Sequence, residues 1–194
     1  MEQFDIAFGS CTVREGVLVI ERRDPEEMGR WEVFREGLSM NLEYRPWVTV
    51  GQLGVMVVLG LIFVGLLWSL YASNPAVAPL VGGLGFLGLA VVGGSLELGY
   101  RRGMRARRRL QKTLADEFSI AYPNRISLAE ITGVTVRPVS TGLFLGDGRL
   151  FLIHFQRDRT KKTTPLGFPE FMSEERATVR NLFEDQEITF SDDD

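Results

Sequence analysis

The chain has 194 residues and a net charge of −3, which allows one ordinary domain, or a small domain together with a second element. Its single cysteine, Cys11, excludes an intrachain disulfide bond and a metal site built from several cysteines. The charge is unevenly distributed: residues 1–49 carry −4, residues 50–100 contain one charged side chain, residues 101–112 carry +7, and residues 113–194 carry −5. Two acidic parts therefore flank an uncharged block that ends in a basic segment.

The first 46 residues have the alternating pattern of β-strands. Residues 5–15 and 17–24 are candidate strands, with Gly16 at the turn between them. Residues 30–44 alternate again, so a further strand is predicted there. Because this part has few apolar residues, we expect its strands to complete a sheet formed elsewhere in the chain.

Residues 47–100 are predicted to form a transmembrane helical hairpin. Two charge-free runs, 50–72 and 76–96, each reach the length of about 20 apolar residues that a spanning helix needs. Asn74 and Pro75 lie in the short link, which makes the two helices antiparallel neighbours. A buried hairpin in a soluble domain is the alternative, but a chain this short could hardly enclose two wholly apolar helices. Aromatic residues typical of the headgroup level flank the runs: Tyr44, Trp47, Trp68, Tyr71 and Tyr100.

The basic segment predicts the orientation of this hairpin. The link between the runs has no basic residue, so both termini are expected to face the cytoplasm, with the chain in the cell membrane as a multi-pass protein. A basic run can also indicate nucleic-acid binding, but this one lacks interleaved aromatic residues and directly follows an apolar span. Anionic lipid headgroups are therefore the expected partner, and no nucleic acid is expected. The segment comprises Arg101, Arg102, Arg105, Arg107, Arg108, Arg109 and Lys112.

A helix over 101–118 is predicted to have two different faces. Arg101, Arg105, Arg108 and Lys112 are expected to point toward the headgroups. The apolar stripe on the same helix is expected to pack on the domain that follows; it consists of Leu110, Leu114 and Phe118.

Small residues in the apolar runs are predicted to mediate helix packing. The sequence GLGFLG, at Gly83, Gly85 and Gly88, matches a dinucleotide-binding fingerprint in letters only, because spanning sequence surrounds it instead of a strand and a helix start. Small residues four apart let helices approach closely in lipid. The pairs are Gly65/Ser69, Ala78/Gly82, Ala90/Gly94 and Ser95/Gly99.

Glu97 is the one ionisable residue in the apolar block. An intramembrane carboxylate is a functional candidate by default. Glu97 precedes Arg101 by four residues, however, so we expect the two to pair at the membrane interface.

Residues 119–187 are predicted to form short strands followed by a helix. Asp147-Gly148 is a hairpin signal, placed between strands at 141–146 and 149–158. The final helix is expected to begin at about Pro169 or Ser173 and to end at Asp185, and residues 188–194 form an acidic tail.

This order of elements resembles that of the bacterial and archaeal pleckstrin-homology-like (PH-like) membrane proteins. The stretch ISLAEITGVTV, residues 126–136, is similar to the family's entry strand, which has the pattern I-x-L-x-x-I-x-x-V, and a hairpin and a terminal helix follow in the expected order. The resemblance implies an α+β membrane protein with a small cytoplasmic antiparallel β-sandwich or half-barrel closed by a C-terminal helix. Because candidate strands precede the membrane hairpin, we expect this PH-like domain to be split.

The residues provide no enzyme chemistry. His154, the only histidine, lies within a predicted strand, and no catalytic set, metal cluster or phosphate loop can be assembled, so no cofactor, metal or small-molecule substrate is expected. A second basic cluster lies at a strand connection and is either a solvated loop or, as the resemblance implies, a contact for phosphate headgroups. Its members are Arg157, Arg159, Lys161 and Lys162.

Two functions remain open from the sequence. One is a non-enzymatic membrane-anchored PH-like module with a scaffold or assembly role, which binds a protein partner, a second copy or lipid headgroups at the inner leaflet. The alternative is an accessory subunit of a membrane transporter or channel complex, whose spans pack against other helices.

Overall fold

The computed structural model describes residues 2–74, 76, 78–140 and 147–192. The chain divides into two units, which we describe separately. One unit consists of Met1–Leu38 and Arg102–Asp194, and the other consists of Ser39–Arg101. The architecture is α+β, with four helices and two sheets among the described residues, in agreement with the predicted class.

The first unit contains an antiparallel sheet that joins residues from both parts of the chain. β3 pairs with β4, which follows the helices, so that Leu18 lies opposite Ile126. The predicted single strand over 5–15 is wrong, because a turn at Ala7 and Phe8 divides it into β1 and β2. In sheet order the strands are β1 (Glu2–Ile6), β2 (Gly9–Arg14), β3 (Val17–Arg22) and β4 (Arg125–Ser127).

The second sheet is formed by the rest of the C-terminal part. β6 and β7 form a hairpin whose turn residues, Asp158 and Arg159, both have positive φ, as a type I′ turn requires. β8 pairs with β5 in parallel. In sheet order the strands are β7 (Thr160–Pro169), β6 (Asp147–Arg157), β5 (Ile131–Ser140) and β8 (Phe190–Asp192).

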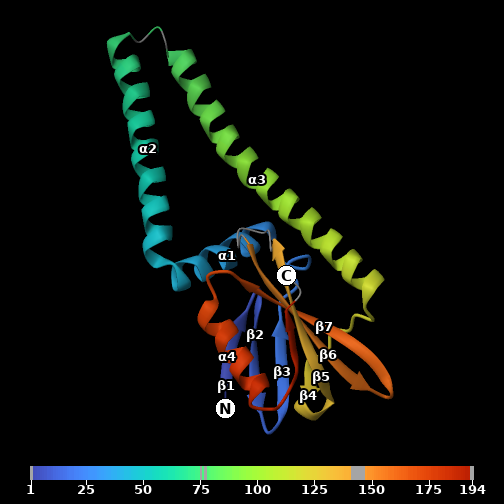
Figure 1. Ribbon diagram of the computed structural model, residues 1–194. Coiled ribbons are helices and arrows are strands. Elements are labelled where there is room, and N and C mark those ends of the chain that lie inside the picture. The colour runs from blue at the N-terminus through green and yellow to red at the C-terminus, as the bar shows by residue number, and fades with distance from the viewer. Residues whose placement is uncertain (1, 75, 77, 141–146, 193–194) are drawn as a thin grey trace. The chain divides into compact units, whose positions relative to one another are not determined.

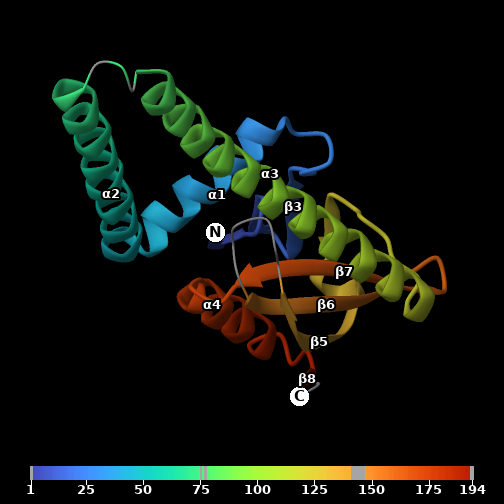
Figure 2. The ribbon, with the colours of Figure 1, turned by 90° about the horizontal axis from the view of Figure 1, so that it is seen from above.

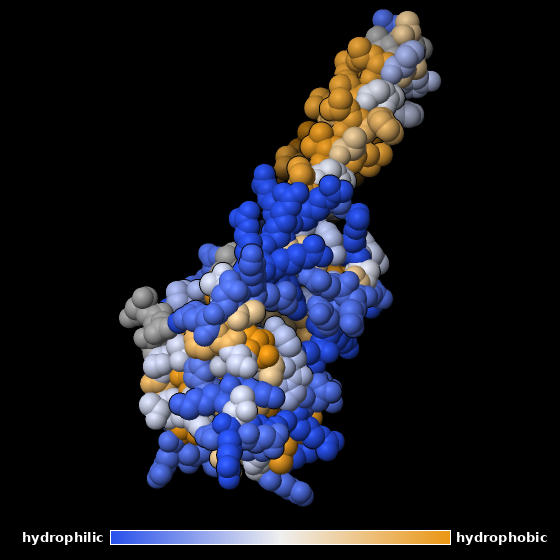
Figure 3. Space-filling view, turned by 90° about the vertical axis from the view of Figure 1, so that its right-hand side faces the viewer, coloured by the Kyte–Doolittle hydropathy of each residue, from blue (hydrophilic) through white to orange (hydrophobic). Residues whose placement is uncertain are grey.

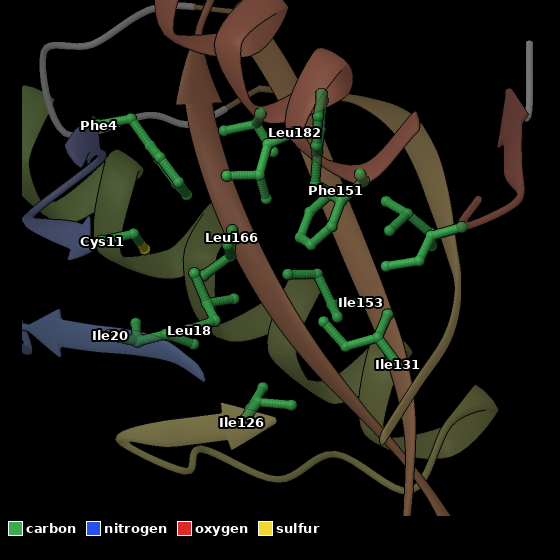
Figure 4. Packing of buried hydrophobic residues seen from close by; sticks show 14 of the residues in the cluster. Phe4, Cys11, Leu18, Ile20, Ile126, Ile131, Phe151, Ile153, Leu166 and Leu182 are labelled. Atoms are coloured by element: carbon green, nitrogen blue, oxygen red, sulfur yellow. The ribbon is translucent and has the colours of Figure 1, made fainter. Parts of the chain in front are cut away.

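The hydrophobic core lies between the two sheets. Alternate residues of each strand point inward, because successive side chains of a strand point to opposite faces. Figure 4 shows Leu18 and Ile20 of the first sheet near Leu166 of the second. The helix α4 (Ser173–Glu184), close to the predicted final helix, adds Val179 and Phe183 to the same core. The sandwich and α4 are seen in Figure 1.

The end of α3 covers the outer face of the second sheet. Leu114 packs on Leu150 and Leu152 of β6, with Leu110 and Phe118 beside it. Figure 2 shows this part of α3 running across β7 and β6. The predicted apolar stripe of this helix is therefore confirmed.

Residues 30–44 form a helix, so the predicted strand is wrong. α1 (Arg30–Tyr44) buries Val33, Gly37 and Met40, which follow the helical period of three to four. Glu32 accepts a hydrogen bond from the Gly29 N–H at 3.0 Å, which satisfies a donor at the start of the helix. The alternation seen in the sequence reflects charged residues on the exposed sides of a helix rather than two faces of a strand.

Two predictions in the C-terminal part are also corrected. Asp147 and Gly148 are paired residues of β6, opposite Ser140 and Val139, and do not form a turn. The strand predicted over 141–146 lies outside the described residues. The stretch 126–136 is not one strand, because the short 3₁₀ helix η2 (Leu128–Glu130) separates β4 from β5 and lets the chain pass from one sheet to the other.

The second unit consists mainly of two long apolar helices. α2 (Pro46–Ser73) and α3 (Ala78–Glu117, with residues up to 101 in this unit) each have the length and hydropathy to cross a membrane, and no residue of their most apolar windows is buried. Figure 3 shows these helices as a largely hydrophobic surface. The predicted spans are thus confirmed as exposed apolar helices.

The two helices approach each other at glycines that the predicted small-residue pairs did not include. A methyl group added to Gly88 would lie 3.3 Å from Phe63, and one added to Gly85 would lie 3.9 Å from Leu67. Gly85 and Gly88 therefore lie on the side of α3 that faces α2.

The small-residue pairs predicted for helix packing do not form this contact. A methyl group added to Gly65, Gly82 or Gly94 would meet nothing within 4 Å. The hydroxyl of Ser95 donates to the Val91 carbonyl of its own helix at 2.7 Å. These residues therefore do not form the contact between α2 and α3, and their role in packing against other helices stays a prediction. All eight predicted packing positions are exposed: Gly65, Ser69, Ala78, Gly82, Ala90, Gly94, Ser95 and Gly99.

Candidate functional site

The basic segment lies on α3, where the apolar part of the helix ends. Three of its seven cations are engaged in ion pairs. Arg101 pairs with Glu97 one turn earlier, as predicted. Arg107 and Arg108 reach the loop after β3: Arg108 Nε lies 3.0 Å from a Glu26 carboxylate oxygen, and Arg107 Nη2 lies 3.5 Å from Asp24 Oδ1.

The other four cations share one exposed face of α3, which we call the basic stripe. Arg102, Arg105, Arg109 and Lys112 follow one another at intervals of three or four residues, and among the described residues none has an ion-pair partner. Two of the four residues predicted to face the headgroups, Arg101 and Arg108, are occupied by internal pairs. The face available to an external anion is therefore the basic stripe.

The second basic cluster is divided in the same way. Arg157 is internal: it donates to Glu130 at 2.9 Å, donates to the backbone oxygen of Arg125, and lies over the Phe155 ring. Arg159 and Lys161 are exposed at the β6–β7 turn, and Lys162 is half-buried. Within this cluster, the cations classed as exposed are therefore Arg159 in the turn and Lys161 at the start of β7.

Both ring nitrogens of His154 have hydrogen-bond partners within the second sheet. Its ring nitrogens lie 2.9 Å from the Thr135 and Thr163 hydroxyls, and its ring contacts Phe118. Burial, followed by the nearby Arg137 charge, lowers the pKa of His154. These contacts agree with a structural role.

Arg22 is a charged residue that the sequence reasoning did not single out. Arg22 lies two residues after Ile20 on β3, so its side chain points to the same inward face of the sheet as Leu18 and Ile20. Arg22 donates from Nη2 to the Thr164 hydroxyl and to the Pro165 carbonyl, and so links the two sheets. The signal that could have revealed it is an arginine at an inward position of an otherwise apolar strand.

The described part of the chain offers few side chains for nucleophilic or metal-dependent catalysis. There, no group of three or more His, Cys, Asp or Glu side chains is placed to hold a metal ion. Cys11 is buried, and this burial raises the pKa of its thiol to about 12, which keeps it protonated and unreactive.

No protein-family model matches the chain, and no curated protein or solved structure is significantly similar to it.

Proposed function

We propose that this chain is a non-enzymatic, membrane-anchored module that binds anionic lipid headgroups through the basic stripe. α2 and α3 cross the cell membrane as a hairpin, and both termini face the cytoplasm. The β-sandwich is held at the inner leaflet, where it serves a scaffold or assembly role.

The observation that supports this proposal is the order in which apolar, basic and packed surfaces follow one another along α3. One continuous helix begins with an exposed apolar part, continues with the four cations of the basic stripe, and ends with Leu114 packed against the sandwich. Cations that directly follow an apolar span lie at the headgroup level of the cytoplasmic leaflet. Each such cation near an anionic surface contributes about 1 kcal/mol of attraction.

The order of elements supports a split PH-like domain. Four antiparallel strands form one sheet, three further antiparallel strands form most of the other, and a helix at the end adds to the core. The helices interrupt this order between β3 and β4. That place of interruption accounts for the strands that precede the membrane hairpin.

The proposal is tested with the full chain reconstituted in bilayers that contain spin-labelled phosphatidylglycerol or phosphatidylcholine. The Arg105→Gln, Arg109→Gln double variant is compared with Arg14→Gln, Arg125→Gln, which removes the same charge from exposed positions on the strands. We expect the first pair to lower the preference for phosphatidylglycerol about tenfold or more at low salt, and the second pair to leave it unchanged. Equal preference in both double variants would overturn the lipid-binding proposal.

A second candidate function is an accessory subunit of a transporter or channel. The open space around Gly65, Gly82 and Gly94 favours it, because glycines that touch nothing in the hairpin leave room for another helix. Purification in mild detergent separates the two functions. A stable complex with different proteins supports the accessory subunit, whereas a lone monomer or homo-oligomer excludes it.

A further inference from the structure

The first unit contains a cavity of about 390 Å³ between the sandwich and the last part of α3. One part of its wall is apolar, and another part carries guanidinium groups. The apolar lining includes Phe8, Leu110, Leu114, Val139, Leu150 and Pro165. The charged lining includes Arg22, Arg23 and Arg107, together with Asp24 and Glu27.

Arg22 is held in place but keeps donors available to the cavity. Its hydrogen bonds all leave from Nη2, and among the described residues no acceptor meets Nη1 or Nε. The Tyr122 ring lies under the guanidinium, 5.1 Å from it. Burial, with a further contribution from the Arg107 charge, lowers the pKa of Arg22. An anion bound beside Arg22 would therefore stabilise its buried positive charge.

Arg107 is the second cation in this wall, and its own hydrogen bonding is incomplete. Its Nε is buried and has no acceptor among the described residues. Its one ion pair, with Asp24, is long at 3.5 Å, and the Asp24 side chain is 47% exposed. Arg23 is neutralised elsewhere by Glu36 at 3.0 Å. The cavity is therefore lined by the guanidinium groups of Arg22 and Arg107, and its carboxylates are Asp24, 3.5 Å from Arg107, and Glu27.

We infer that this cavity binds a small organic anion with one phosphate or carboxylate head and a short apolar body. The head lies between Arg22 and Arg107, because guanidinium groups match the paired oxygens of both head types. The apolar body lies against Phe8, Leu114 and Leu150. Asp24 competes with the ligand for Arg107.

The cavity has room for a phosphate or carboxylate head and a short alkyl segment, since its volume is about 390 Å³. The cavity is partly open, so the end of a longer single chain can extend out of it. Its shape therefore fits a single-chain amphiphile, either taken from the membrane or free in solution. The site is separate from the basic stripe, so it can be tested independently of the proposed function.

The test is calorimetric titration of the full chain in nanodiscs of zwitterionic lipid. Hexyl phosphate is the probe, with inorganic phosphate as the head alone and 1-hexanol as the body alone. We expect hexyl phosphate to bind at least tenfold more tightly than either fragment. If inorganic phosphate binds as tightly as hexyl phosphate, or if none of the three binds, the inference is wrong.

Three variants test the assigned residues. Arg107→Gln should weaken hexyl phosphate binding at least tenfold, and Arg14→Gln, which removes the same charge from an exposed position on β2, should leave it unchanged. Asp24→Asn should tighten binding about threefold or more, because it removes the competing charge and keeps the oxygen that accepts from the Glu26 N–H. A loss of folding cannot produce tighter binding. If Asp24→Asn weakens binding, or if Arg14→Gln weakens it as much as Arg107→Gln, the assignment is overturned.

A competition experiment distinguishes the two sources of the ligand. Displacement of hexyl phosphate by lysophosphatidic acid incorporated in the nanodisc supports a membrane-derived amphiphile. Displacement by hexanoate from solution, without an effect of lysophosphatidic acid, supports a free organic anion. Displacement by neither compound contradicts the inferred ligand class.

Discussion

Leu18 of β3 and Ile126 of β4 lie directly opposite each other in adjacent strands, although α1, α2 and α3 separate them in the sequence. Both side chains are fully buried in the core between the two sheets. The chain thus leaves the sandwich, forms the helices and returns to the same sheet. Neither part of the chain contains the whole core.

The first prediction concerns this shared core. Leu18→Ala should lower the free energy of unfolding of the sandwich by about 2–5 kcal/mol, because it removes buried methyl groups and leaves a cavity. Ile126→Ala added to it should cost less than the sum of the two single changes, because neighbouring residues share a cavity. Hydrogen exchange of β6 and β7 in the full chain measures the effect.

Glu21→Ala is the matched control, since Glu21 lies on β3 and is exposed. It should change the stability by no more than about 0.5 kcal/mol. If Leu18→Ala leaves exchange in β6 and β7 as slow as in the unsubstituted chain, the two sheets unfold independently, and the shared core has no energetic role.

The second prediction concerns the contact between α2 and α3. Gly88→Ile should push the two helices apart, because a Cβ at this position already lies 3.3 Å from Phe63. Gly82→Ile should have no such effect, because its surroundings are open. The distance between spin labels on α2 and α3 measures the separation. Equal distances in the two variants would show that Gly88 does not determine the spacing.

The third prediction is a pH dependence from His154. Its pKa in the folded protein is lowered by burial, whereas in the unfolded chain it is about 6.5. Below that value the unfolded chain binds the proton more readily, so protonation favours unfolding and stability falls as the pH drops from 7 toward 5. His154→Gln should show a shallower loss over this interval in urea unfolding experiments. A loss of equal slope in both proteins would assign the pH dependence to other groups.

The fourth prediction concerns Cys11. With its pKa raised to about 12 by burial, the thiol should not react with a disulfide reagent at pH 8 in the folded protein, and should react fully in denaturant. Leu18→Ala should accelerate the reaction, because a less stable sandwich opens more often. Rapid labelling of the folded, unsubstituted chain would contradict the buried position of this residue.

Local patterns in the sequence predicted the features that depend on neighbouring residues along the chain. The two apolar helices follow from the length and hydropathy of the charge-free runs. The Glu97–Arg101 pair and the stripe of Leu110, Leu114 and Phe118 follow from helical spacing. The prediction of a strand over 30–44 was wrong because charged residues alternate there by chance. The helix start is marked instead by Glu32, which accepts a hydrogen bond from the Gly29 N–H.

The spacing of small residues did not predict which side of each apolar helix meets the other. Ser69 and Gly99 belong to pairs with the expected spacing of four, yet both are exposed. Gly88 is the residue that approaches Phe63. A spacing of four residues identifies a face of a helix, but the face that is used depends on how the neighbouring helix is placed.

Only the tertiary structure decided which cations are available to a partner. The helical spacing placed Arg105 and Arg108 on the same face, yet Arg108 pairs with Glu26 from a distant part of the chain, whereas Arg105 stays exposed. Arg107 likewise meets the distant Asp24. Such ion pairs, the pairing of Leu18 with Ile126 and the cavity beside Arg22 depend on contacts between residues far apart in sequence. The sequence by itself determined the apolar helices and the charge that follows them, because length, hydropathy and helical period are local properties. The closure of the sandwich and the division of the basic segment into internal and exposed residues are not local, because they arise only when distant strands pack together.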